Sequence, residues 1–395
     1  MIQPASRADL PHSFVVFSLL WLAGIYLRLT VLVAPPLAPF ITDELALNQT
    51  QLGALTTLPV LMLALGALPG SLVIARLGPT LTLVLSLVVV AIASASRGLA
   101  PPVWLLFFYT TLMGLAIAAM QPAFPVLVLR WSPGHVALGS AVYLNGMLMG
   151  EFVGGGLTLP VMMPLMDNDW RLALVFWSLP ALPIAALVFM WGHLGIPRAK
   201  LAAEGPPHWI PPFNEPRIWH LGIVLGAASA GFFGTNAYLS TLLEEKGILD
   251  LLPLYLGVFN GTQVIGSLTM VVLARFLVGR RTPVIIMSWG ILFGLVAVVL
   301  GNVYIGLAAV ALLGICTCVQ LILLVGLVPQ IASIKNAAPL AAGMFTVGYL
   351  IAFVVPLLGG MAADILGSVQ INFVPLVMLT VIAIFLSHRS THIHQ

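Results

Sequence analysis

Long apolar runs fill most of this chain and constrain its fold more than any other feature. Twelve such runs are separated by charged residues, Gly or Pro, and each is close to the roughly 20 residues that a helix needs to cross a bilayer. Only 7% of the 395 residues are charged, whereas soluble domains carry about 25%. A surface that faces water needs more charge than this, so we expect a membrane around the chain.

The runs fall into two groups of six, which predicts an all-α membrane protein with 12 transmembrane helices in two pseudo-symmetric bundles. The first bundle, 1–192, has expected spans at 14–38, 51–75, 79–97, 102–128, 137–163 and 171–192. The second bundle, 217–395, has expected spans at 217–243, 251–276, 281–300, 303–329, 337–361 and 366–387. Between them, the polar and proline-containing stretch 193–216 is interpreted as a cytoplasmic linker.

The uneven distribution of Lys and Arg predicts the orientation. If both termini are cytoplasmic, the cytoplasmic segments hold eleven basic residues, and the outer loops hold Arg97, Arg171 and Lys246. Basic loops remain on the cytoplasmic side. The polar N-terminal stretch 1–13 precedes a run too long for a cleavable signal. We therefore expect a multi-pass protein of a bacterial inner membrane, with both termini in the cytoplasm.

Arg28 lies two positions from the middle of the expected span 14–38. A charge at that depth costs about 2.5–3.5 kcal/mol on insertion scales, so the side chain must face a partner or an aqueous cavity. We interpret Arg28 as the cation that binds an anionic or electron-rich substrate, because its guanidinium suits planar oxygen acceptors. The alternative is a structural charge paired with a carboxylate.

Glu151 is the one carboxylate within the expected spans, near the middle of 137–163. The first and fifth spans run in the same direction, so Glu151 and Arg28 have similar depth and a pair is possible. We interpret Glu151 as a proton-coupling residue, or as the group that holds Arg28 when the site is empty. The alternative is a packing residue that stays protonated.

The two halves share weak internal similarity, which is typical of secondary transporters. The offset between Gln121 and Gln320 equals that between Arg76 and Arg275, so both glutamines rank first among neutral polar candidates. With Arg28, the predicted substrate-binding residues are Tyr26, Gln121, Asn236, Gln320 and Tyr349. For such side chains, hydrogen bonding between helices is the alternative role; it applies equally to Tyr143, Asn145, Tyr238, Asn260, Gln263 and Thr346.

Several functional classes are disfavoured. The sequence has no G-x-x-x-x-G-K-[ST], no H-E-x-x-H and no Ser/His constellation, so we expect no enzyme, cofactor or metal site. Cys316 and Cys318 point to nearly opposite sides of a helix. The net charge of +3 forms no cluster suited to nucleic acid. A passive channel needs repeated pore-lining groups, and one Arg and one Glu within the spans form no such ring. A receptor needs a signalling domain, for which the linker and the short tails are too small.

The two six-helix halves resemble the major facilitator superfamily. Its first intracellular loop is usually written G-x-x-x-D-R-x-G, and the corresponding segment here reads "SLVIARLG". Arg76 and Gly78 match, which implies a place in the gating loop, whereas Ser71 and Ala75 replace the Gly and the Asp. The role of that Asp therefore does not carry over.

The segments 27–40, 52–65, 119–131 and 347–360 resemble the branch of the superfamily that contains bacterial cyanate and 2-nitroimidazole transporters. This resemblance implies an Arg of the first helix at the substrate site, which falls on Arg28. It does not supply Glu151, because small residues such as Gly are common there in the branch, and this departure puts cyanate itself in doubt.

We therefore expect a monomeric secondary transporter that moves a small anion or a small planar polar compound, cyanate-like or a related organic anion, by alternating access. Proton coupling through Glu151 is part of this hypothesis. The first alternative is an efflux pump for a drug-like nitroheterocycle with the same fold. A passive channel and a non-transporting receptor are the others.

Overall fold

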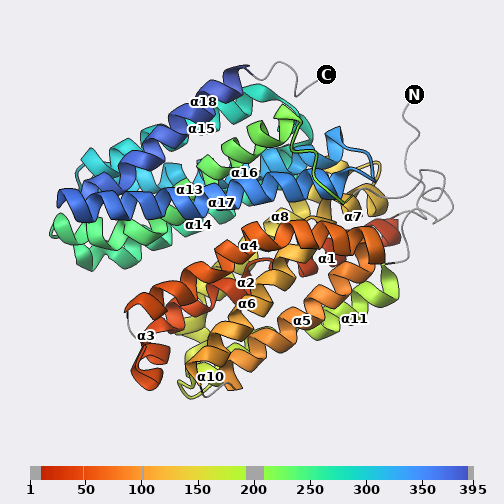
Figure 1. Ribbon diagram of the computed structural model, residues 1–395, viewed down its shortest axis with the longest axis horizontal. Coiled ribbons are helices and arrows are strands. Elements are labelled where there is room, and N and C mark those ends of the chain that lie inside the picture. The colour runs from red at the N-terminus through yellow and green to blue at the C-terminus, as the bar shows by residue number, and fades with distance from the viewer. Residues whose placement is uncertain (1–9, 48, 100–101, 193–208, 390–395) are drawn as a thin grey trace. The chain divides into compact units, whose positions relative to one another are not determined.

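The computed structural model describes residues 10–47, 49–99, 102–192 and 209–389. Within these ranges the chain is helical and has no strand, and twelve helices are long and apolar enough to cross a membrane (Figure 1). The all-α fold with twelve spans that the apolar runs predict is therefore confirmed.

The chain divides into two compact units. Unit 1 comprises Met1–Pro211 and Val328–Ala342, and unit 2 comprises Pro212–Leu327 and Gly343–Gln395. Most of the predicted linker, 193–208, lies outside the described residues, so its role remains a prediction.

Unit 1 is built from short helices as well as long ones, because four of its six spans are interrupted. The first span consists of α1 (Leu10–Ile25), α2 (Leu29–Leu32) and α3 (Ala34–Leu45), and the next two are the continuous helices α4 (Gln49–Leu77) and α5 (Pro79–Leu99). The fourth span consists of α6 (Val103–Met120) and α7 (Ala123–Trp131); the fifth of α8 (Val136–Gly156), η1 (Thr158–Met162) and α9 (Met163–Leu165); and the sixth of α10 (Trp170–Ser178) and α11 (Ala181–Trp191).

Unit 2 has longer, continuous helices. Its elements are α13 (Pro216–Glu245), η2 (Leu249–Leu251), α14 (Leu252–Leu277), α15 (Arg281–Leu300), α16 (Val303–Ile331), α17 (Ala337–Leu366), η3 (Val369–Phe373) and α18 (Val374–Arg389). Helix α17 continues through Pro356, and residues 328–331 of α16 and 337–342 of α17 belong to unit 1. The interruptions described below are therefore a feature of unit 1.

Proline explains three of the four interruptions. Pro122, Pro160 and Pro180 lie at the breaks of the fourth, fifth and sixth spans, and each lacks the N–H that a helix needs. The first span breaks without a proline at Tyr26–Arg28. There the backbone N–H groups of Tyr26, Leu27 and Arg28 bond the carbonyl three residues back, at 3.0–3.2 Å, so a tighter turn replaces the α-helical pattern.

A row of glycines brings α8 against the broken first span. Gly146, Gly150 and Gly154 recur every fourth residue and therefore lie on one face of α8. A side chain at these positions would overlap the carbonyl oxygens of Trp21, Ile25 and Leu29, respectively. The backbones are thus closer than any larger residue permits, which is how helices associate when lipid surrounds them.

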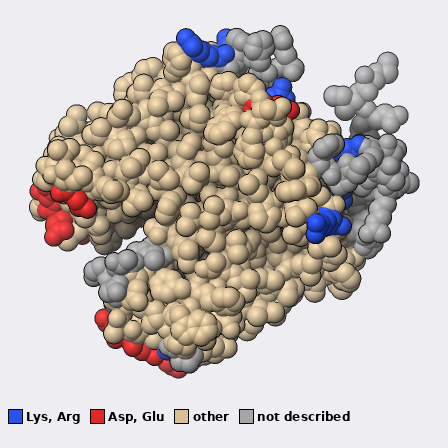
Figure 2. Space-filling view, in the orientation of Figure 1, with Lys and Arg blue, Asp and Glu red and all other residues tan. Residues whose placement is uncertain are grey.

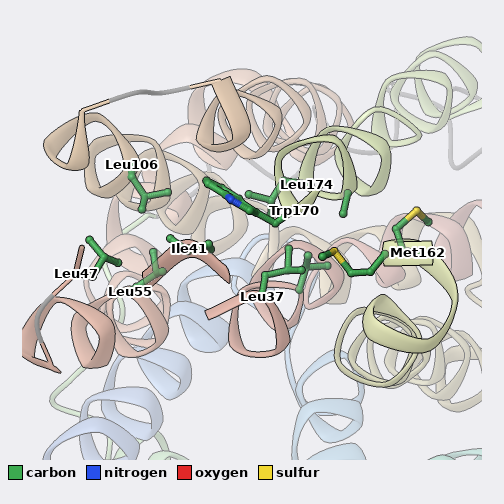
Figure 3. Close-up of a cluster of buried hydrophobic side chains, with 11 residues drawn as sticks. Leu37, Ile41, Leu47, Leu55, Leu106, Met162, Trp170 and Leu174 are labelled. Carbon is green, nitrogen blue, oxygen red and sulfur yellow. The ribbon is translucent and has the colours of Figure 1, made fainter. Parts of the chain in front are cut away.

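One end of unit 1 holds a cluster of buried apolar side chains from α3, α4, α6, α9 and α10 and the segments beside them. Trp170 lies near the centre of the side chains labelled in Figure 3 and is 4% exposed. The cluster, called here the end cluster, consists of Val33, Leu37, Ile41, Leu47, Leu55, Leu106, Met162, Met163, Trp170, Ala173 and Leu174.

Hydrogen bonds among polar groups beside the end cluster join the helices at this end of unit 1. Glu44 accepts hydrogen bonds from Trp170 Nε1 at 2.6 Å and from Arg171 Nη2 at 2.8 Å. Arg171 Nη1 also donates to the carbonyl oxygen of Gly98 at 3.0 Å. The hydrogen bonds from Arg171 and Trp170 hold the pKa of the Glu44 carboxyl below its ordinary value of 4.5. Helices α3, α5 and α10 are thereby joined at one point.

Large apolar side chains cover the outside of the helices. Leu65, Ile92, Phe189, Ile265 and Phe293 are each more than half exposed. In Figure 2 most of the described surface is uncharged, and the charged atoms lie toward its margins. Water-soluble monomers rarely expose contiguous apolar areas beyond a few hundred Å². The surface is that of a protein surrounded by lipid.

The glycine row predicts that alanine has very different effects on stability at two positions of α8, Gly150 and Gly155. Gly150→Ala should lower the unfolding temperature in detergent, because the new methyl group forces α8 away from Ile25, an overpacking cost of about 1–3 kcal/mol. Gly155→Ala is the matched control, because the nearest atom to its Cβ would be Leu32 O at 4.0 Å. Alanine there should leave the unfolding temperature unchanged or raise it. Equal effects would contradict this packing.

The lowered pKa of Glu44 predicts a pH-dependent contribution to stability. A carboxyl whose pKa falls on folding stabilises the protein above its unfolded-state pKa, and that stabilisation disappears as pH falls through the folded-state value. Glu44→Gln should therefore lower the unfolding temperature at pH 7. The difference from the wild type should shrink below about pH 4.5. A difference that is constant between pH 7 and pH 3 would contradict the assignment.

Candidate functional site

The break in the first span carries the most informative charged residue. Arg28 ends the turn with φ −136° and ψ −29°, immediately before α2, and is 3% exposed. Its Nη1 donates to the carbonyl oxygen of Leu27 at 3.4 Å. The helical pattern is lost where Arg28 enters the interior of unit 1, so backbone carbonyls and a guanidinium lie together there.

Glu151 on α8 is the ionic partner of Arg28. Arg28 Nε donates to Glu151 Oε1 at 3.1 Å, and the two side chains are 3% and 10% exposed. Glu151 lies about midway along the fifth span, which extends from Val136 to Leu165. It directly follows Gly150, whose contact with Ile25 brings α8 to the break. The pair that similar depth makes possible in the sequence is therefore formed.

Hydrogen bonds between helices fix the surroundings of the pair. Tyr26 Oη donates to the carbonyl oxygen of Trp177, at the end of α10, at 3.1 Å. Trp177 Nε1 in turn donates to Thr158 Oγ1 on η1 at 3.1 Å. Trp21 Nε1 donates to Asn145 Oδ1 at 2.9 Å, joining α1 to α8. The hydroxyl of Tyr26 thus connects the breaks of the first and sixth spans.

Gln121 lies at the break of the fourth span, between α6 and α7. It is 5% exposed, and its carbonyl oxygen accepts from Phe124 N at 3.3 Å. Phe124 stacks on Tyr143 of α8 with ring centroids 4.7 Å apart. The fourth span therefore packs on the helix that carries Glu151. The predicted role of Gln121 in binding remains a prediction.

The other predicted substrate-binding residues are in unit 2. Gln320 on α16 is fully buried; its Oε1 accepts from Ser288 Oγ at 3.2 Å and its Nε2 donates to Val224 O at 3.3 Å. Asn236 donates to Phe232 O of its own helix at 3.0 Å. Tyr349 is buried and stacks on Phe345. Gln320 thus holds α13, α15 and α16 together, which is the alternative role considered for such residues.

The gating-loop candidates lie between α4 and α5. Arg76 is exposed in the last turn of α4. Gly78 follows with φ +81°, a conformation that residues with a side chain rarely adopt. Its N–H bonds Ile74 O at 2.8 Å and its carbonyl accepts from Thr82 N at 3.1 Å. Gly78 thus allows α4 to end and α5 to begin within one residue.

Arg97 requires a correction. Its position at the end of an apolar run indicates an outer loop, but the structure places it in the last turn of α5, where it is 1% exposed. Its Nη2 donates to Thr30 O on α2 at 2.8 Å and to Ser94 Oγ at 2.7 Å. The apolar run ends at the same residue whether Arg97 points inward or outward, so the sequence carries no signal for its burial.

Within the described ranges, no group of three or more His, Cys, Asp and Glu is arranged to hold a metal ion. Cys316 and Cys318 are buried free thiols, and Cys318 Sγ donates to Gln263 O at 3.2 Å. The chemistry available around the first-span break is that of a guanidinium, a carboxylate and hydrogen-bonding groups. Such a set can bind and release a polar molecule or a proton.

Comparisons with known proteins agree with this architecture. The chain is 27% identical over 389 residues to the 2-nitroimidazole transporter of Escherichia coli K12, covering 91% of each chain. It is 26% identical over 228 residues to the cyanate transport protein CynX of the same organism, covering 57% of this chain and 58% of CynX. These similarities confirm the resemblance that the sequence segments indicate.

Solved structures show the same fold at lower identity. The proton:xylose symporter XylE aligns with a TM-score of 0.76 and 12% identity, over 95% of both chains. The human organic anion transporter MFSD10 aligns with a TM-score of 0.68 and 16% identity, over 98% of this chain and 100% of that one. A family model described as the Major Facilitator Superfamily matches residues 20–284. The chain is a multi-pass membrane transporter that belongs to the major facilitator superfamily.

Proposed function

We propose that this transporter moves a small anion or a small planar polar compound, cyanate-like or a related organic anion, by alternating access across the inner membrane of a bacterium. The substrate binds Arg28 near the middle of the membrane. Both termini are cytoplasmic in this proposal, as the distribution of Lys and Arg predicts. The relatives that transport 2-nitroimidazole and cyanate support a small planar or linear polar substrate.

The observation that carries the proposal is the Arg28–Glu151 ion pair at the helix break. Burying two charges costs several kcal/mol per ion before their attraction is counted, so such a pair is weak evidence for a stabilising role. Charged residues within membrane spans instead mark substrate and ion pathways. A guanidinium offers planar, paired donors to a carboxylate, and a substrate with acceptor oxygens or nitrogens can take that place.

Glu151 can couple transport to protons, because it is the carboxylate that the substrate replaces on Arg28. While Glu151 is ionised it holds Arg28; once protonated it loses its charge, and Arg28 is released to a substrate anion. One proton and one monovalent anion would then be carried together without net charge. In this proposal the same groups are reset when the anion leaves and Glu151 ionises again.

The groups around Glu151 are compatible with this proton step. The elements packed on α8 carry Tyr26 beside α1, Arg130 on α7, and Asp43 and Glu44 on α3. Among the described residues, Arg28 is the cation within 4 Å of Glu151. Arg28 is therefore the direct ionic partner of Glu151 in the proton step.

An efflux pump for a drug-like nitroheterocycle is the second candidate, and the similarity to a 2-nitroimidazole transporter favours it. It has the same fold and differs in the direction of transport and in its dependence on Arg28. An uncharged heterocycle binds largely through apolar and stacking contacts. Such a pump should continue to work when Arg28 is replaced.

Substitution of Arg28 tests the substrate class. In proteoliposomes, Arg28→Ala should lower the affinity for cyanate or another transported anion about 10- to 100-fold, as expected for a lost hydrogen bond between charged groups. Arg28→Lys keeps the positive charge, so its affinity for the anion should fall less than that of Arg28→Ala. The double variant Arg28→Ala/Glu151→Gln removes both charges, so it controls for instability caused by an unpaired Glu151. Undiminished 2-nitroimidazole transport by Arg28→Ala would favour the efflux pump.

Glu151→Gln tests proton coupling. The variant cannot release a proton at this position, so the rate of anion uptake should no longer respond to an imposed pH gradient. Counterflow of labelled substrate, which needs no net proton movement, should continue. Glu44→Gln is the matched control, because it makes the same change at an exposed carboxylate of the end cluster's rim; its pH dependence between pH 5.5 and 8 should equal that of the wild type. Unchanged pH dependence in Glu151→Gln would refute the coupling.

A further inference from the structure

Arg97 is a second cation in the interior of unit 1. It is among the largest fully buried side chains of the protein, at 1% exposed. The helix α5 carries it next to Gly98, whose Cα faces the backbone of Arg171 so closely that a side chain there would overlap the Arg171 carbonyl. This tight contact holds α5 against α10, and the Arg97 side chain extends from α5 to Thr30 of the first span.

The charge of Arg97 is not balanced by a carboxylate in the described part of the chain. The ion pairs there are Arg28–Glu151 and Arg171–Glu44. Arg97 Nη2 has two neutral acceptors, Thr30 O and Ser94 Oγ. Arg97 Nε has no hydrogen-bond acceptor, and the nearby Thr30 Oγ1, also buried, has no partner. Because a guanidinium stays protonated, the protein carries a buried positive charge at a cost to its stability.

Arg97 lies close to the residue that binds substrate in the function proposed above. Its Nη2 is 2.8 Å from the carbonyl oxygen of Thr30, which follows Arg28 by two residues. A helical rise of about 1.5 Å per residue then keeps this nitrogen within about 10 Å of the Arg28 backbone. Around the first-span break, two guanidinium groups therefore accompany one carboxylate.

We propose that Arg97 is a positioning residue of the anion site, whose unbalanced charge selects anions over neutral compounds. This inference rests on the function proposed above. Arg97 does not touch the substrate: it holds the α2 turn through Thr30 O, and its charge raises the electrostatic potential at Arg28. With an effective dielectric constant of about 20, a unit charge roughly 10–15 Å from an anion at the Arg28 guanidinium changes the affinity for a monoanion about 5- to 15-fold.

The unbalanced charge also explains why an anion would be retained while Glu151 is neutral. When Glu151 is protonated and Arg28 holds a monovalent anion, the charge of Arg97 is still unmatched and continues to attract that anion. When Glu151 ionises, Arg97 attracts its carboxylate as well, and that carboxylate competes with the anion for Arg28. Arg97 thus raises the affinity for the anion in the state in which Glu151 is protonated, without contacting the anion.

The experiment separates the charge of Arg97 from its hydrogen bond. Arg97→Lys keeps a charge and a donor for Thr30 O, whereas Arg97→Gln keeps a donor and loses the charge. Arg171→Gln is the control: it removes an Arg that contacts the neighbouring Gly98 but is 26% exposed. Purified variants would be titrated with sodium cyanate, nitrate and acetate, with sodium chloride at equal ionic strength as the reference. The unfolding temperature reports binding, because a ligand of the folded state raises it.

The expected result is that Arg97→Gln lowers the affinity for the bound anion about tenfold, while Arg97→Lys and Arg171→Gln stay within about threefold of the wild type. The unfolding temperature of ligand-free Arg97→Gln should equal or exceed that of the wild type, because the variant no longer buries an unbalanced charge. A residue that serves only the fold would show the opposite pattern.

Three outcomes would overturn the inference. Anion binding that is lost in Arg28→Ala but kept in Arg97→Gln would refute the role of Arg97 alone. Misfolding of Arg97→Gln, or a lower unfolding temperature with unchanged affinity, would assign Arg97 to the fold. A wild-type protein that none of the three anions stabilises would instead contradict the anion substrate, and this inference with it.

Discussion

The cost of placing a guanidinium in an apolar interior governs the arrangement of unit 1. Arg28 can lie near the middle of a span because Glu151 reaches it at 3.1 Å, and Glu151 can reach it because the glycine row of α8 lets two backbones come into contact. A helix break supplies the turn on which Arg28 sits. Charge, glycine packing and broken helix therefore depend on one another.

The interruptions of unit 1 concentrate polar groups without exposing them to lipid. Irregular backbone at membrane depth is tolerated where protein surrounds it, and here Tyr26, Trp177 and Thr158 connect three of the breaks by hydrogen bonds. Unit 2 has long helices, and α17 continues through Pro356. Discontinuous helices are where transporters of this kind bind and move, which is consistent with placing the proposed site on unit 1.

The buried charges differ in how the protein satisfies them. Arg28 has a carboxylate, and exchange of that partner for a substrate is the basis of the proposed transport step. Arg97 has neutral acceptors and an unbonded Nε, so its charge acts on its surroundings instead of being cancelled. Arg171 and Glu44 are partly exposed and join helices at the rim of the end cluster. All three cations are arginines, and their roles differ because Arg28 and Arg97 are buried whereas Arg171 is partly exposed to solvent.

The sequence alone determined the all-α fold, the twelve spans and the two central charges, because hydrophobic length and the rarity of in-span charge are local properties. It allowed Arg28 and Glu151 to meet but did not decide it, since their contact depends on the spacing of glycines that reads equally well as general helix packing. Arg97 shows the limit most clearly. Its run of apolar neighbours ends at the same residue whether Arg97 lies in a loop or is buried. Only the tertiary structure brings the Thr30 carbonyl within hydrogen-bond distance of the guanidinium and buries it.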